Sequence, residues 1–186
     1  MTPGQIGAVG VCVAIVALSW WGMRAGWNRR RRSTAALVPA LPTRPDGLGA
    51  RRFGPVEAVY VSTTAAGDWL DRVVAADLGV RSPASVSVHD AGVLVERTGA
   101  ADLFVPAGAL RAATAAPGIA GKVVGGDGLV VLTWAVAADD ARGLDTGLRT
   151  RHAADREALI AAAGELAATP NPDSADDAPR PSKEHS

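Results

Sequence analysis

The sequence has a single cysteine, Cys12, among its 186 residues, which excludes an intramolecular disulfide framework and a zinc site built from cysteines. Aromatic residues make up only 4% of the chain, and five of them are tryptophan. Bulky apolar residues are fewer than the 48% hydrophobic content indicates, because 38 residues are alanine. A chain of this length can form one domain with extensions, but not a barrel enzyme of about 250 residues.

Net charge is also absent, because 19 basic residues balance 19 acidic residues. The balance does not hold locally. Residues 1–52 carry eight arginines and one acid, Asp46, which gives +7, whereas residues 53–186 carry eleven basic and eighteen acidic groups, which gives −7. Two segments of opposite net charge are typical of a chain that contacts a membrane or a nucleic acid at its charged end.

An uncharged stretch of eighteen residues, IGAVGVCVAIVALSWWGM, runs from Ile6 to Met23. As a helix it would be about 27 Å long, close to the ~30 Å thickness of the bilayer hydrocarbon. Tryptophans and arginines lie at its C-terminal end, where indole rings and cations favour the membrane interface. The sequence therefore predicts a transmembrane helix. Its predicted contacts with the interface and with anionic lipids are Trp20, Trp21, Arg24, Trp27, Arg29, Arg30, Arg31 and Arg32.

The arginines follow the apolar stretch, which by the positive-inside rule places the N-terminus outside and the C-terminal domain in the cytoplasm. A cleaved signal peptide is the nearest alternative, but it needs basic residues before the apolar stretch and small residues after it. Here MTPGQ precedes the stretch, and Trp20-Trp21 lie near its end. We therefore expect a single-pass protein of the inner (plasma) membrane, with the lipid bilayer as one partner.

Composition divides the chain into four regions. Residues 1–32 hold the predicted transmembrane helix and its basic stop region, and residues 33–52 form a linker that three prolines and two glycines keep irregular. Residues 53–168 form the folded domain. Residues 169–186 lack large apolar side chains and are rich in proline, aspartate and serine, which predicts a disordered acidic tail.

Within the folded domain, alternating apolar and polar residues predict about seven short strands, followed by a helix over 153–168. Two further features are predicted locally. Asp68 is placed to cap a short helix that ends at Gly79. The glycine-rich segment 125–128 is placed to join 122–124 and 129–137 as a hairpin. A mainly β chain closed by one helix predicts two packed antiparallel sheets or a partly open barrel.

Four stretches carry a resemblance to a known family: the apolar N-terminal segment with arginines 29–32, the hairpin SVHDAGVLVER, the strand GLVVLTWAV, and LDTGLRTRHAADREALIAA. The layout resembles the pleckstrin-homology (PH) superfold. More specifically, it resembles actinobacterial single-pass membrane proteins with a cytoplasmic PH-like domain, often labelled transporter or export proteins and encoded near pyrimidine-biosynthesis genes. The resemblance implies a PH-like sandwich with a C-terminal capping helix, and a membrane-tethered interaction module.

The sequence predicts no catalytic, cofactor-binding or metal site. His89 and His152 lack further ligands at metal-binding spacing, and the glycines of 125–128 are not followed by the Lys and Ser/Thr of a phosphate-binding loop. The negative charge of the folded domain disfavours nucleic acid. It also disfavours specific phosphoinositide binding, because the segment directly after the first strand offers only Arg72 and Arg81, which are offset by Asp68, Asp71 and Asp77.

Two functions remain open. The first is a non-enzymatic scaffold that holds an unidentified protein partner at the cytoplasmic face of the membrane. The alternative is an accessory subunit of a membrane transporter, since one span cannot form a pathway by itself and small residues at Gly7, Gly10 and Ala14 would permit close helix packing. A permease that co-purifies with the protein would favour the transporter subunit over the scaffold.

Overall fold

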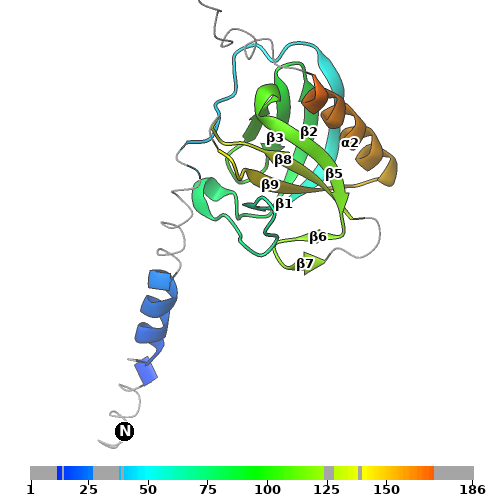
Figure 1. The fold of residues 1–186 in the computed structure, drawn as a ribbon. Coiled ribbons are helices and arrows are strands. Elements are labelled where there is room, and N and C mark those ends of the chain that lie inside the picture. The colour runs from blue at the N-terminus through cyan, green and yellow to red at the C-terminus, as the bar shows by residue number, and fades with distance from the viewer. Residues whose placement is uncertain are drawn as a thin grey trace, which may run out of the picture.

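A computed structural model describes residues 12–13, 15–26, 38, 40–123, 128–137 and 140–169. Residues 12–13 and 15–26 are helical, and the remaining described residues form a domain built on one curved sheet (Figure 1). The strands are β1 (Arg51–Ala65), β2 (Ser82–His89), β3 (Gly92–Arg97), β4 (Leu103–Pro106), β5 (Leu110–Ala116), β6 (Gly118–Ile119), β7 (Lys122–Val123), β8 (Leu129–Trp134) and β9 (Leu144–Thr150).

Seven strands pair antiparallel in the order β4-β3-β2-β1-β9-β8-β5, and β6 and β7 form a separate short hairpin. The long strand β1 pairs with both β2 and β9, so it joins the two halves of the sheet. Strands β4 and β5 lie at opposite edges and do not pair with each other, which leaves the barrel open. One apolar core includes Val86 and Leu103 from one half and Leu132 and Leu148 from the other.

Helix α2 (Ala153–Ala168) packs on this core and lies closest to β5. Its boundaries are those that the sequence predicts. Leu159, Ala163 and Leu166 are its buried residues, and their spacing places them along one side of the helix. The described residues are thus mainly β with a C-terminal helix, as the sequence predicts, and seven of the strands form a partly open barrel from one sheet rather than two packed sheets.

The helix predicted between Asp68 and Gly79 is wrong. Only Ala75–Asp77 (η1) is helical there, as a single 3-10 turn. The backbone stays beside β1 instead, because the amide of Val73 donates to the carbonyl of Thr63 and Arg72 forms a β-bridge with Thr64. Hydrogen bonds to β1 therefore replace the intrahelical bonds that the local sequence pattern favoured.

The hairpin predicted between 122–124 and 129–137 is also wrong. Strand β7 pairs with β6, whereas β8 pairs with β5 on one side and β9 on the other. Both faces of β8 are covered, since Leu132 is buried in the main core and Val131 in a smaller cluster with Ile119 and Leu129. Because β8 pairs on both sides, with β5 and β9, it lies in the interior of the sheet and not in a hairpin with β7.

The segment before β1 packs on the domain as far back as Val38, which is 6% exposed and belongs to the main core. Leu41 packs against the same core. Backbone bonds attach the following residues, because the amides of Asp90 and Ala91 donate to the carbonyls of Ala50 and Leu48. Part of the segment that the sequence assigned to a linker is therefore in contact with the fold.

Residues 6–11 and 14 of the predicted transmembrane segment lie outside the described residues. In the part of the chain that the structure does describe, no helix combines the length and the apolar character needed to cross a membrane.

Candidate functional site

Three of the residues predicted at a membrane interface lie in the described helical segment. Trp20 is 70% exposed, Trp21 is 71% exposed, and Arg24 is also exposed. The others, Trp27 and arginines 29–32, lie outside the described residues. Their role at the interface stays a prediction.

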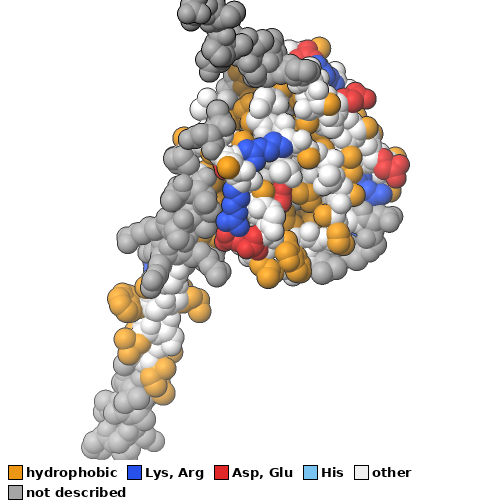
Figure 2. Space-filling view, in the orientation of Figure 1, with side chains coloured by type: hydrophobic (Ala, Val, Ile, Leu, Met, Phe, Trp, Pro, Cys, Tyr) orange, Lys and Arg blue, Asp and Glu red, His pale blue; other side chains and the backbone are white. Residues whose placement is uncertain are grey.

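The loop between β1 and β2 presents a second set of exposed apolar side chains. Trp69 is 52% exposed and Leu70 is 64% exposed, and both lie in the segment that the sequence predicted as a short helix. Val80, at the other end of the loop, is 44% exposed. In Figure 2, hydrophobic side chains gather at the lower edge of the domain, beside acidic ones. Large apolar residues at a loop tip are candidates for a binding surface.

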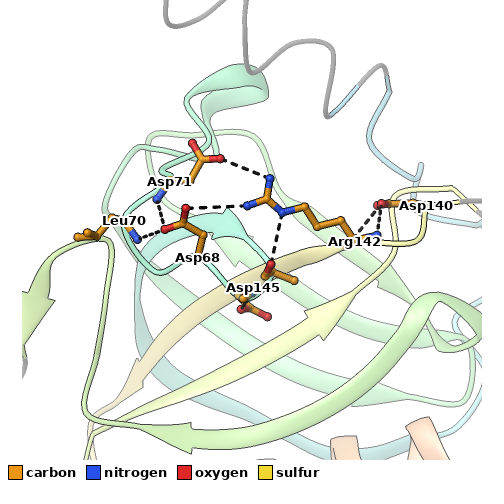
Figure 3. Close-up of polar contacts among 9 residues, drawn as sticks. Asp68, Leu70, Asp71, Asp140, Arg142 and Asp145 are labelled. Carbon is orange, nitrogen blue, oxygen red and sulfur yellow. Dashed lines mark hydrogen bonds and ion pairs between the residues drawn. The ribbon is translucent and has the colours of Figure 1, made fainter.

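Polar contacts hold this loop in place (Figure 3). The carboxylate of Asp68 accepts hydrogen bonds from the amides of Leu70 at 3.0 Å and Asp71 at 3.2 Å, which is an Asx turn. Arg142 reaches this turn from the β8–β9 connection, with Nη2 3.9 Å from Asp68 and Nη1 3.8 Å from Asp71. Leu70 points away from these charges. The turn thus fixes the backbone from which Leu70 projects.

The β8–β9 connection that carries Arg142 is itself held by Asp140. Its carboxylate accepts from the amides of Gly143 at 2.9 Å, Val136 at 3.1 Å and Arg142 at 3.2 Å. These bonds, first that from Gly143, lower the pKa of Asp140. Arg111 adds hydrogen bonds to three carbonyls of the same connection. The arm that supports the loop therefore has a defined backbone conformation.

Cations gather beside the apolar loop. Desolvation, and after it the charges of Arg72 and Arg81, lower the pKa of Lys122, so the three groups lie near one another. A Cβ at Gly121, next to Lys122, would lie 3.7 Å from Cδ2 of Leu70. Gly121, which precedes Lys122, therefore lies against the apolar side chain of Leu70.

These cations are not neutralised by neighbouring acids among the residues that the structure describes. The aspartates that the sequence set against Arg72 and Arg81 include Asp68 and Asp71, and both instead pair with Arg142. No described carboxylate lies within ion-pair distance of Arg72, Arg81 or Lys122. Arg72 donates instead through Nε to Oγ of Ser62 at 3.0 Å. The net charge of the domain thus conceals a local positive surface.

A hollow on the sheet extends this positive surface. Arg81 and Arg149 both line it, together with Arg151. Arg151 is paired with Glu57, since Nη1 lies 2.6 Å from Oε2. Arg149 has no ion-pair partner among the described residues and is exposed. We call Trp69, Leu70, Arg72, Arg81, Lys122 and Arg149 together the loop surface.

A buried polar network supports the loop surface from inside the barrel. The hydroxyl of Tyr60 donates to the carbonyl of Leu78 at 2.8 Å and lies 2.6 Å from Oγ1 of Thr63. Thr63 bonds Thr146 at 2.8 Å, and Nε1 of Trp134 donates to Thr146 at 2.9 Å. Burial raises the pKa of Tyr60 to about 12. Satisfied buried networks of this kind rigidify a core.

Neither histidine of the domain takes part in the loop surface. His89 shares a 3.0 Å hydrogen bond with Oγ of Ser87, and His152 occupies the N-cap position of α2 without a side-chain bond to the helix. The described residues contain no group of three or more His, Cys, Asp or Glu side chains able to hold a metal ion.

Sequence reasoning missed the loop surface because it assigned Trp69 and Leu70 to a helix. The one local signal was Gly67-Asp68, a pair that favours a turn as well as a helix N-cap. Lys122 and Arg149 lie far from that turn in sequence, and the fold brings them together.

A protein-family model described as "Bacterial PH domain-like" matches residues 38–164. The match begins at the buried Val38, covers the whole seven-stranded sheet and ends within α2. No curated protein matches the sequence.

Proposed function

Because the chain belongs to the bacterial PH domain-like family, we propose that it is a membrane-anchored interaction module without enzymatic activity. Its N-terminal helix anchors it in the inner (plasma) membrane, with the N-terminus outside, and its domain holds a protein partner at the cytoplasmic face. The family is the premise for a binding role, although a PH-like fold by itself does not name a ligand.

The distribution of apolar side chains around the N-terminal helix carries this proposal. Seven large apolar residues of the segment are between 57% and 76% exposed, namely Val13, Ile15, Val16, Leu18, Trp20, Trp21 and Met23. At about 100° per residue these positions point to every side of the helix. A surface helix of a globular domain is polar on one side, whereas a helix that is apolar all round is buried in protein or in a bilayer.

The short connection to the domain supports a position close to the membrane. Only eleven residues, 27–37, separate the helical Gly26 from the buried Val38. The twelve Cα–Cα steps from Gly26 to Val38 span at most about 40 Å when the chain is fully extended. A domain tethered in this way cannot move far from the bilayer, which suits a module that concentrates a partner there.

A sheet edge offers the protein partner a place to bind. Strand β4 forms one edge of the sheet, and α2 packs mainly against β5 at the other. An extended peptide can add to such an edge through backbone hydrogen bonds. We assign the partner to β4 because α2 occupies the surroundings of β5.

Membrane extraction and cysteine labelling test the anchor. The full chain should stay in the membrane pellet at alkaline pH in sodium carbonate, whereas a chain lacking residues 1–32 should be released. In a Cys12→Ser background, Thr2→Cys should react with a membrane-impermeant maleimide on intact spheroplasts, and the domain control Thr98→Cys should react only after lysis. Carbonate release of the full chain, or the opposite labelling pattern, would contradict the anchor or its orientation.

Crosslinking in native membranes tests the scaffold role. A soluble protein captured by the full chain and lost when β4 is blocked, for example by Val105→Pro, would support the scaffold. Capture of a multi-span permease would favour the transporter-subunit alternative instead. Val105 is buried, so circular dichroism must show that the variant remains folded. The control variant is Ala161→Ser. Ala161 is exposed on α2 and is not part of β4, so this change should leave capture of the partner unchanged.

A further inference from the structure

The loop surface combines two kinds of side chain that a soluble surface seldom places together. Trp69 and Leu70 project from a loop tip at 52% and 64% exposure. Lys122, with Arg72 and Arg81 near it, lies next to that tip through Gly121. Indole and leucine side chains favour the boundary between headgroups and acyl chains, and cations favour the phosphates just above it.

The apolar tip is held outward rather than left to collapse onto the domain. The Asx turn at Asp68 fixes the backbone of Leu70 and Asp71, and Arg142 pairs with both aspartates. Figure 3 shows Leu70 directed away from the charged groups. A preorganised tip loses little conformational freedom on binding, which favours association.

The charge around the tip complements an anionic surface. Within the described residues, the cations of the loop surface have no carboxylate at ion-pair distance, because Asp68 and Asp71 pair with Arg142 and Glu57 pairs with Arg151. Asp77 lies in the same loop and is the one acid there without a described pair. Arg142 carries one positive charge against the two carboxylates of Asp68 and Asp71, so the local count is five cations against three acids. The difference, 5 − 3 = +2, leaves the surface locally positive, despite the −7 of residues 53–186.

We propose that the loop surface docks on the anionic lipid bilayer, with Trp69 and Leu70 in the headgroup boundary and Arg72, Arg81, Lys122 and Arg149 against lipid phosphates. This proposal rests on the proposed function, because a tether of eleven residues between Gly26 and Val38 holds the domain close to the bilayer in which the N-terminal helix is anchored. The bilayer is favoured over an acidic protein or a nucleic acid because it alone offers an apolar layer beneath a layer of negative charge. No single headgroup is required.

Site-directed spin labelling of the full chain tests the docking. In a Cys12→Ser background, Leu70→Cys carries a nitroxide, and Ala161→Cys on the exposed side of α2 is the matched control. Both proteins are reconstituted in phosphatidylcholine vesicles with or without phosphatidylglycerol. Collision of the label with oxygen, which dissolves in the bilayer, is compared with collision with a water-soluble nickel chelate.

With phosphatidylglycerol, the label at 70 should collide more with oxygen than with nickel, and the label at 161 should keep the opposite order. The double change Arg81→Gln and Lys122→Gln should return label 70 to water. The matched change Arg44→Gln and Arg51→Gln removes two exposed cations elsewhere and should leave label 70 in the bilayer.

Three results would overturn the docking. One is a label at 70 that remains in water while the chain stays in the vesicles, which leaves the anchor intact. Another is equal entry into neutral vesicles, which removes the role of the cations. The third is protection of label 70 from nickel by polyglutamate or single-stranded DNA in detergent, which assigns the surface to another macromolecule. A chain that does not stay with vesicles of either kind overturns both the anchor and the docking.

Discussion

Arg142 pairs with Asp71, with Nη1 3.8 Å from Oδ2, and so joins the β8–β9 connection to the loop that follows β1. Both side chains are about half exposed, at 50% and 43%. A pair with that exposure contributes little to overall stability. Its consequence is local, because it holds the backbone that presents Trp69 and Leu70.

Arg142→Ala should therefore loosen the loop without unfolding the domain. We expect the free energy of unfolding to change by less than about 1 kcal/mol. Hydrogen exchange at the amides of Leu70 and Asp71 should accelerate, because the Asx turn loses its ionic support. The matched control is Arg44→Ala, which removes a pair with Glu96 at 3.8 Å and similar exposure. Unchanged exchange at Leu70 in Arg142→Ala would show that the turn holds the loop alone.

Because Trp69 is exposed and Trp134 is buried, replacing each of them should affect the free energy of unfolding differently. Trp69→Ser should change the free energy of unfolding by no more than about 0.5 kcal/mol, as is usual at exposed sites. Trp134 is fully buried and donates to Thr146, so Trp134→Phe should lose about 1–3 kcal/mol. Urea unfolding of both variants, followed by circular dichroism, checks the difference. A large loss in Trp69→Ser would place that side chain in the core instead.

Tyr60 is the only tyrosine in the chain, so tyrosinate absorbance at 295 nm reports this one group. Burial raises its pKa to about 12, against about 10 in an unfolded chain. The unfolded state therefore loses its proton first. Stability that is fully present below pH 10 should fall by about 1.4 kcal/mol per pH unit as the pH rises from 10 toward 12.

Absorbance in urea should show a midpoint near pH 10, whereas the folded chain should ionise only near pH 12 or on unfolding. Tyr60→Phe removes both the absorbance change and this part of the alkaline destabilisation. It also removes one of the two hydrogen bonds to the carbonyl of Leu78, which the amide of Thr63 still binds, and this loss should cost about 0.5–1.5 kcal/mol at neutral pH. A midpoint near pH 10 in a chain that circular dichroism shows to be folded would contradict the burial of the hydroxyl.

Local patterns predicted the parts of the fold that local forces determine. The boundaries of α2 were predicted because helix formers, an acidic first turn and the following Pro170 act within a few residues. The β2–β3 hairpin was predicted because the turn at Asp90-Ala91-Gly92 lies between alternating strands, and the observed register pairs His89 with Gly92. Such elements need no distant partner to be recognised.

Distant contacts determine what the sequence could not predict. The segment after Asp68 resembles a helix, but the carbonyl of Thr63 binds the amide of Val73 and keeps it extended. The sequence of β8 favours a hairpin with the preceding residues 122–124. In the structure β8 instead pairs with β5, where Val131 lies opposite Thr114. The loop surface was missed for the same reason, since the acids that seemed to neutralise Arg72 bind Arg142 from another part of the chain.

Two glycines test the support of the β6–β7 hairpin, which carries Lys122. A Cβ at Gly147 in β9 would lie 2.7 Å from Cγ2 of Ile119, whose side chain is only 2% exposed. Gly147→Ala should therefore displace β6 and lose about 1–3 kcal/mol through overpacking. Gly164 in α2 has nothing within 4 Å of the same added atom, so Gly164→Ala should gain about 0.5–1 kcal/mol from helix propensity.

Urea unfolding of the two alanine variants measures the opposite signs, and hydrogen exchange over 118–123 locates the effect. Faster exchange there in Gly147→Ala, with no change in Gly164→Ala, is expected because only the first variant displaces Ile119. Lys122 follows Ile119 by three residues and should move with it, so Gly147→Ala should also weaken the docking of label 70 on anionic vesicles. Gly147→Ala with wild-type stability and exchange would mean that Ile119 does not pack on β9, and the position of Lys122 beside the loop would then lose its structural support.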